Sequence, residues 1–150
     1  MNVHSESTAS KPIRIGIIGA GAVSDYHHVP GIQIDPRAKL VAACDGNDAL
    51  LEQRKSDWGI EKTTTDYKAL CADPDIDAVI IATPNFTHKN MAIEAARNGK
   101  HIMCEKPLGL SGDEVHEMRD AAVAAGVVHM TALTYRFAPS MRYIHHLVTS

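Results

Sequence analysis

The stretch Ile13-Arg14-Ile15-Gly16-Ile17-Ile18-Gly19-Ala20-Gly21-Ala22-Val23-Ser24 decides the fold. Its first half is short, apolar and rich in β-branched residues, which is typical of a buried strand. Gly19 and Gly21 interrupt this strand, and residues 22 to about 34 have a composition that suits a helix. A strand, a glycine turn and a helix in this order predict the first unit of a dinucleotide-binding domain.

The spacing Gly19-x-Gly21-x-x-Ser24 has a physical reason at each position. Gly19 permits a tight turn, and Gly21 lets the backbone approach a pyrophosphate at the start of the helix, where Ala22 and Val23 lie. Ser24 stands where a third glycine is usual, and its small side chain still allows close packing of strand and helix. Glycine turns follow many first strands, so the motif needs support from the rest of the chain.

Asp45 gives that support, since it follows an apolar stretch at residues 39–44 and lies 21 residues beyond Ser24. An acid at this separation accepts hydrogen bonds from the hydroxyls of the adenosine ribose and repels a 2′-phosphate. No lysine or arginine occurs between Asp45 and Arg54 to attract that phosphate. NAD is therefore favoured over NADP. The alternative is that Asp45 only caps the next helix.

Apolar strands and helical stretches alternate along nearly the whole chain. Further strands are predicted at residues 39–44, 63–65, 78–82, 101–104 and 127–131, and further helices at residues 47–58, 66–71, 85–97, 111–125 and 136–148. Pro30 predicts a kink or an early stop in the first helix. This alternation predicts an α/β fold in which a doubly wound parallel sheet of about six strands has helices on both faces, the Rossmann fold.

The capping residues and inner faces of two later helices are also predicted. Asp66 is expected to cap the helix at 66–71, and Ser111 with Glu114 forms a capping box. The helix that follows is expected to bury Val115, Met118, Ala122 and Ala125, because these residues recur at helical spacing.

Composition excludes several classes of protein. The chain has 150 residues, 45% of them hydrophobic, which suits one globular domain, and its net charge of −3 argues against nucleic acid or anionic membrane as a partner. Its three cysteines are far apart and form no CxxC, which indicates buried thiols in a reducing cytoplasm and no metal site. Residues 1–12 are expected to be a flexible tail, because they lack the apolar core of a signal peptide.

Two more segments end predicted strands at the edge of the sheet where ligands bind. Thr83-Pro84-Asn85 is followed by His88, although Pro84 and Asn85 also suit an ordinary helix start and His88 a surface or capping role. Lys106, in Glu105-Lys106-Pro107, can hydrogen-bond a substrate hydroxyl and favour its deprotonation as hydride leaves. The alternative is a solvated lysine at a strand end. Whether the Lys106–Pro107 bond is cis stays open.

Together these segments resemble the glucose-fructose oxidoreductase/inositol dehydrogenase/MocA family from residue 13 to residue 150. TPNFTH, CEKPL and YRFAP, in this order, are the specific part of the resemblance. It implies that Lys106 is catalytic and lies beside the nicotinamide. It also implies cofactor contacts from the Gly19–Ser24 loop, Asp45, Thr83, Pro84, Asn85, His88 and Glu105, and places Arg136 at the nicotinamide end. His27 and His28 are interpreted as packing and capping residues of the first helix.

Members of that family are similar two-domain enzymes of about twice this length or more, whose second domain supplies an acid/base histidine. The resemblance therefore implies a Rossmann domain at residues 13–135 and the start of a connection, at 136–150, to a second domain absent from this chain. The function expected is half of an oxidoreductase that acts on a secondary alcohol of a sugar or polyol, with self-association through uncovered surfaces. The alternatives are a stand-alone nucleotide-binding module, a SAM-dependent methyltransferase and a hydrolase that uses NAD transiently.

Overall fold

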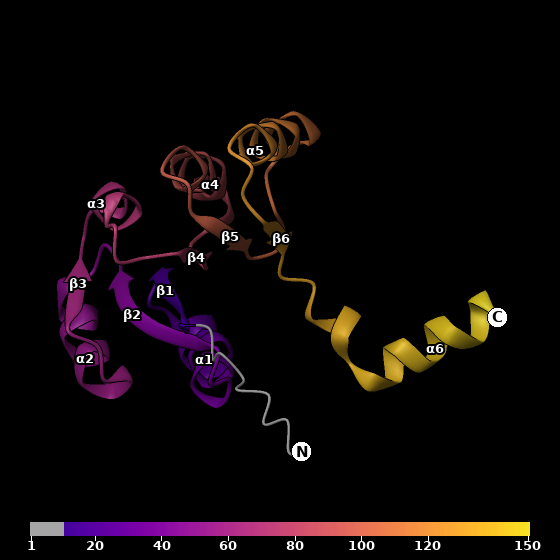
Figure 1. Cartoon of the computed structure of the whole chain (residues 1–150), viewed down its shortest axis with the longest axis horizontal. Coiled ribbons are helices and arrows are strands. Elements are labelled where there is room, and N and C mark those ends of the chain that lie inside the picture. Colours follow the sequence, from indigo (N-terminus) through magenta and orange to yellow (C-terminus); the bar gives the residue numbers. More distant parts are fainter. Residues whose placement is uncertain (1–10) are drawn as a thin grey trace, which may run out of the picture.

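A parallel sheet forms the centre of the molecule, in a computed structural model that describes residues 11–150. The predicted tail at residues 1–12 lies almost wholly outside the described residues. The six strands, in the spatial order β3-β2-β1-β4-β5-β6 (Figure 1), are β1 (Ile13–Ile18), β2 (Ala38–Cys44), β3 (Lys62–Thr64), β4 (Ala78–Ile81), β5 (His101–Cys104) and β6 (His129–Thr131). All neighbouring pairs are parallel, which confirms the predicted doubly wound sheet.

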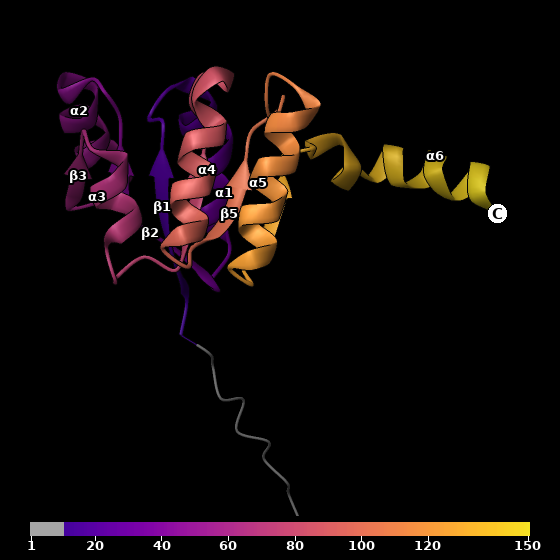
Figure 2. The same ribbon diagram turned by 90° about the horizontal axis from the view of Figure 1, so that it is seen from above.

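Helices cover both faces of this sheet. They are α1 (Val29–Ile34), α2 (Asp48–Trp58), α3 (Tyr67–Ala72), α4 (His88–Arg97), α5 (Gly112–Ala124) and α6 (Pro139–Thr149). In Figures 1 and 2, α1 and α2 lie on one face, and α3, α4 and α5 lie on the other. Because all six strands are parallel, their carboxyl ends meet at one edge, together with the loops that lead into the helices.

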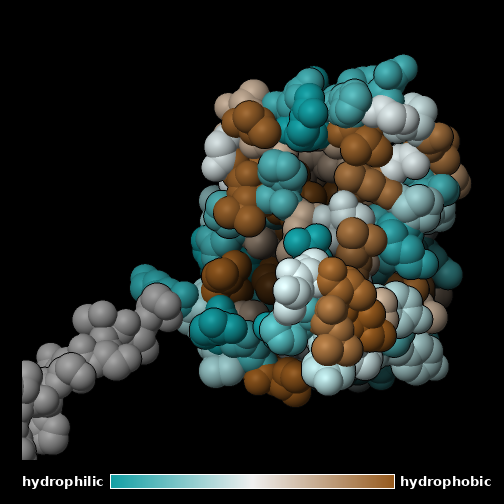
Figure 3. Space-filling view, turned by 90° about the vertical axis from the view of Figure 1, so that its right-hand side faces the viewer, coloured by the Kyte–Doolittle hydropathy of each residue, from teal (hydrophilic) through white to brown (hydrophobic). Residues whose placement is uncertain are grey.

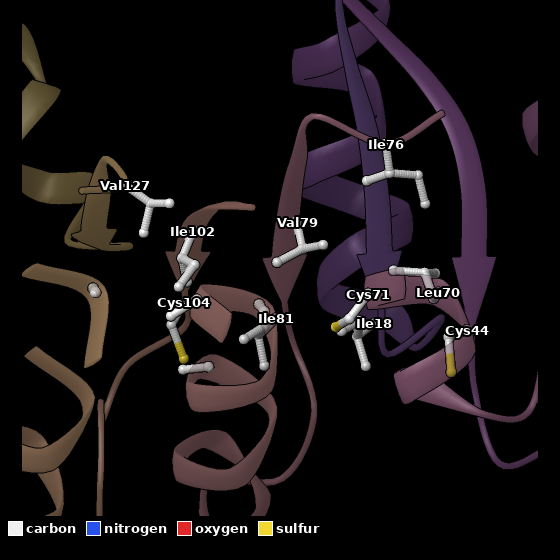
Figure 4. Packing of buried hydrophobic residues seen from close by; sticks show 14 of the residues in the cluster. Ile18, Cys44, Leu70, Cys71, Ile76, Val79, Ile81, Ile102, Cys104 and Val127 are labelled. Atoms are coloured by element: carbon white, nitrogen blue, oxygen red, sulfur yellow. The ribbon is translucent and has the colours of Figure 1, made fainter. Parts of the chain in front are cut away.

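Two apolar clusters hold the layers together, one on each face. Alternate residues of a strand point to opposite faces, so Ile17 packs toward α1 and α2, whereas Ile18 packs toward α3 and α4. Figure 4 shows the second cluster, in which Val79 and Ile81 of β4 lie near Cys71 of α3. The central strands β1, β2 and β4 contribute residues to both clusters because both faces of the sheet are covered.

The first helix differs from the prediction in one respect. It begins directly after Gly21, but residues Ser24–His28 form a π-helical turn in which the N–H of Val29 donates to the carbonyl of Ser24. Pro30, which has no N–H to donate, follows this turn and lies at the start of α1. An early stop at Pro30 is wrong, since the helix continues to Ile34.

The predicted caps form, but two other details of α5 differ from the prediction. Asp66 accepts the N–H of Lys68, and Ser111 accepts the N–H of Glu114. The carboxylate of Glu114, however, accepts the N–H of Leu110 and not that of Ser111. The helix ends at Ala124, so the predicted burial of Ala125 is wrong and its side chain is exposed.

The C-terminal segment extends away from the sheet (Figures 1 and 2). A helix was predicted from Arg136, but that residue lies in a 3₁₀ turn, Thr134–Phe137, and α6 begins at Pro139. The apolar residues of α6 are exposed, and Figure 3 shows hydrophobic side chains among polar ones on this side of the molecule. Among residues 11–150, no helix has both the length and the apolar character needed to cross a membrane.

Candidate dinucleotide-binding site

The loop after β1 requires glycine at one position and leaves open space at another. Gly19 has a φ of +103°, and a Cβ there would lie 2.5 Å from the carbonyl oxygen of Ala82. Its N–H donates to the carbonyl of Cys44 at 2.7 Å, which ties the loop to β2. A Cβ on Gly21 would meet nothing within 4 Å. Gly19 is thus needed for the turn itself, whereas the backbone at Gly21 faces free space.

Ser24 shows why a small residue follows at the third position of the motif. Its side chain is fully buried, and its hydroxyl donates to the carbonyl of Gly19 at 2.6 Å. Asp25 is the first residue whose N–H donates back into the helix, to the carbonyl of Gly21. The N–H groups of Ala22 and Val23 therefore precede the first helical donor, and such groups at a helix start bind anions.

Asp45 is held in place by backbone groups on either side of it. One carboxylate oxygen accepts the N–H of Ala20 at 2.8 Å, and the other accepts the N–H of Asn47 at 3.0 Å. Asp45, Gly19 and Gly21 line one cavity of about 400 Å³, together with Ile18, Cys44, Gly46, Thr65, Tyr67, Ala82, Thr83, Pro84, Thr87 and Met91. A cavity of this size suits a small organic ligand.

The buried side chain of His88 contacts the loop after β4 through the carbonyl of Thr83. This side chain is 1% exposed, with Nε2 2.9 Å from the carbonyl oxygen of Thr83 and Nδ1 3.1 Å from that of Pro107. The prediction of a surface or capping histidine is therefore wrong. His88 connects the loops after β4 and β5, and Asn85 begins the 3₁₀ turn, Asn85–Thr87, that leads into α4.

The loop after β5 carries Lys106 beside an anchored carboxylate. The N–H of Glu105 donates to the carbonyl of Ile81, and one oxygen of its side chain accepts the N–H of Lys106 at 3.1 Å. The other oxygen lies 3.1 Å from Nε2 of His28. Lys106 is exposed, and the bond between Lys106 and Pro107 is cis.

His28 is the residue of this site that sequence reasoning missed. It is 8% exposed, and burial lowers the pKa of its imidazole below the ordinary value of 6.5, against the opposing effect of Glu105. A neutral His28 donates its Nε2–H to the carboxylate of Glu105. The adjacent histidines in the sequence gave a signal, but His27 is exposed and only His28 reaches the loop after β5.

The predicted residues thus divide into four groups. Gly19, Gly21, Asp45, Thr83 and Pro84 line one cavity, and Glu105 and Lys106 follow β5 further along the same edge. Ser24 and His88 lie buried beneath the loops. Arg136 lines a separate hollow near α6, with Tyr135 and Arg142, so the structure does not bring it to the cavity.

Similar proteins agree with this arrangement. A family model described as "Oxidoreductase family, NAD-binding Rossmann fold" (GFO_IDH_MocA) matches residues 13–133. Levoglucosan dehydrogenase of Pseudarthrobacter phenanthrenivorans is 36% identical over 86% of this chain and 35% of its own length. The scyllo-inositol 2-dehydrogenase (NAD(+)) of Bacillus subtilis is 39% identical over 85% of this chain and 37% of its own.

Solved structures give the same picture. The crystal structure of myo-inositol 2-dehydrogenase from Lactobacillus plantarum superposes with a TM-score of 0.86 at 35% identity, covering 93% of this chain and 41% of that one. The chain therefore spans about two fifths of the length of the relatives that it matches. Among them, D-xylose 1-dehydrogenase (NADP(+)) 2 of Haloferax volcanii, 34% identical over 90% of this chain and 41% of its own, is named for the phosphorylated cofactor.

The family model covers most of the chain, and the observed sheet is the fold that it describes. This chain belongs to the glucose-fructose oxidoreductase/inositol dehydrogenase/MocA family of oxidoreductases, as an NAD(P)-binding Rossmann domain.

Proposed function

We propose that this chain binds NAD across the carboxyl edge of its sheet. As part of a longer protein, it would serve hydride transfer involving a secondary alcohol or ketone of a sugar or polyol. The observation that carries the proposal is the order of groups along that edge. Asp45 follows β2, the glycine loop follows β1, Thr83 follows β4 and Lys106 follows β5, in the order in which these strands are neighbours.

Each residue has a role that suits its chemistry. The backbone N–H groups after Gly21 would hold the pyrophosphate, and Asp45 would accept hydrogen bonds from ribose hydroxyls. The bound cofactor supplies the hydride chemistry. Lys106 would hydrogen-bond the substrate oxygen and stabilise negative charge on it as its proton leaves.

The surroundings of Asp45 support NAD over NADP. A 2′-phosphate near this carboxylate would be repelled, and Arg54, the first cation after Asp45 in the sequence, is already paired with other groups. Arg54 donates to the carbonyl of Ala20 at 3.2 Å and forms ion pairs with Asp25 at 3.1 Å and with Asp57 at 3.3 Å. Its side chain is 11% exposed and is already neutralised.

Cofactor titration tests the binding part of the proposal. We expect NADH to bind the 150-residue chain, and NADPH to bind about tenfold or more weakly, a difference of about 1.4 kcal/mol. Asp45→Ala should weaken NADH binding and narrow the difference between the two cofactors. If NADH does not bind at millimolar concentration, or if SAM displaces it, the proposal fails.

A turnover assay tests the catalytic part. The chain would be joined to the remaining length of the 39% identical scyllo-inositol relative, and a panel of polyols and sugars would be screened for NAD reduction. We expect Lys106→Ala to abolish turnover while NAD affinity stays within about a factor of ten. Normal turnover by this variant would show that Lys106 is not catalytic. NAD binding without turnover of any substrate would favour a binding module.

A further inference from the structure

A buried pair of side chains lies next to Lys106, and the proposed function assigns it no role. Nε2 of His28 is 3.1 Å from Oε1 of Glu105, and the two side chains are 7% and 14% exposed. Oε2 of Glu105 accepts the N–H of Lys106, so both oxygens of the carboxylate have a partner. The pair joins the helix that follows the glycine loop to the loop after β5, across 77 residues of sequence.

This pair carries one negative charge at neutral pH. Burial lowers the pKa of His28, more than the neighbouring carboxylate raises it, so its ring is neutral and donates a hydrogen bond to the charged Glu105. The other titratable groups beside it are His27, which lies in the same turn and is exposed, and Lys106, whose side chain is also exposed. Because the pair is shielded from solvent, its charge acts more strongly on a neighbouring group than an exposed carboxylate would.

The position of the pair follows from the strand order. Asp45 and the glycine loop lie at the ends of β2 and β1, and Glu105 lies two strands beyond β1, at the end of β5. If the adenosine half of the cofactor binds at Asp45 and the pyrophosphate at the glycine loop, the nicotinamide half extends toward β4 and β5. This step rests on the proposed function.

We propose that the His28–Glu105 pair determines which redox state of the nicotinamide the chain binds more tightly. The oxidised ring carries a positive charge and the reduced ring is neutral. A single buried negative charge at this end of the site therefore favours NAD⁺ over NADH. When His28 takes up a second proton on its ring, the pair becomes neutral and that preference is lost.

The test measures a ratio of affinities and needs no catalysis. NAD⁺ and NADH are titrated separately into the 150-residue chain by calorimetry at about pH 8 and about pH 5. At pH 8, Glu105→Gln keeps the shape of the side chain and removes its charge, and we expect the preference for NAD⁺ to fall about tenfold, as for loss of a charge in a partly shielded site. In the unaltered chain the preference should also fall between pH 8 and pH 5, since His28 gains its proton below pH 6.5.

Two histidine variants locate the titrating group. His28→Gln keeps a side-chain donor but does not titrate, so its preference for NAD⁺ should stay nearly constant over this pH range. His27→Gln removes the adjacent, exposed histidine and should follow the unaltered chain.

The two proposals fail in different ways. If neither cofactor binds the unaltered chain, the proposed function and this inference both fail. If both bind but the ratio is the same at pH 8 and pH 5, or the same in Glu105→Gln, the inference alone is overturned. The pH comparison on the unaltered chain holds even where a buried substitution prevents folding.

Discussion

Gly19 and Gly21 stand two residues apart in one loop, but alanine at each should affect a different property. Gly19→Ala should lower the stability of the fold, and Gly21→Ala should lower the affinity for NADH. Alanine at position 19 is forced to a φ of +103°, which costs about 1–2 kcal/mol. Its Cβ would also lie 2.5 Å from a backbone oxygen of Ala82, and relieving such a contact costs about 1–3 kcal/mol. We expect Gly19→Ala to lose about 3 kcal/mol of unfolding free energy, which lowers Tm by about 6–12 °C in a domain of this size.

Gly21→Ala is the matched control, because its Cβ would meet nothing within 4 Å. Its unfolding free energy should stay within about 1 kcal/mol of the unaltered chain. NADH affinity should nevertheless fall about tenfold or more, because the new methyl group occupies the space left for a pyrophosphate. Urea denaturation and NADH titration of both variants provide the measurements. Equal stability of the two variants would refute the argument for Gly19, and unchanged NADH affinity in Gly21→Ala would refute that for Gly21.

Three further predictions concern buried or paired groups. Ser24→Ala should lose about 1 kcal/mol in urea denaturation, because the hydrogen bond to Gly19 is removed, whereas Ser56→Ala, at an exposed site, should change stability by less than about 0.5 kcal/mol. Burial raises the pKa of the thiols of Cys44, Cys71 and Cys104 to about 12, so a thiol reagent at pH 8 should label none of them in the folded chain and all three in urea; labelling of the folded chain would contradict their burial. Hydrogen bonds from Arg14 lower the pKa of Asp77 to about 2, so the stability from this pair is complete above pH 3.8 and is lost as the pH falls toward 2. Asp77→Asn should therefore lose less stability than the unaltered chain between pH 4 and pH 2, and equal losses would show that the pair contributes nothing.

The sheet was predictable because its signals are local. The central strands β1, β2, β4 and β5 are largely apolar runs, and the glycine after β1 and the capping residues Asp66 and Ser111 mark boundaries by their own chemistry. The start of α6 was placed three residues too early, since Arg136 and Phe137 suit a 3₁₀ turn as well as an α-helix. Asp45 was predicted as a ligand for ribose, but its hydrogen bond to Ala20 joins two separate loops and has no local signal.

The buried histidines show where sequence reasoning ended. His28 reaches Glu105, and His88 reaches Pro107, 19 residues further along the chain. His28 was interpreted as a packing or capping residue, and His88 as a surface or capping residue or, by resemblance, a cofactor contact. A polar residue in a helical stretch does not indicate which distant loop it contacts. These contacts depend on the strand order, which places β1, β4 and β5 side by side and so brings the segments that follow them close together.

The π-helical turn at Ser24–His28 is equivalent to one extra residue inserted into a helix. In an uninterrupted α-helix, Val29 would lie about 140° around the axis from Ser24. With the extra residue, Val29 lies one full turn after Ser24, and both are buried against the sheet, at 2% and 0% exposure. A regular α-helix over the same residues would turn Val29 out of the core while Ser24 stays beneath the glycine loop. Deleting the exposed Tyr26 would remove the extra residue and leave Ser24 and Val29 on one face of an ordinary α-helix.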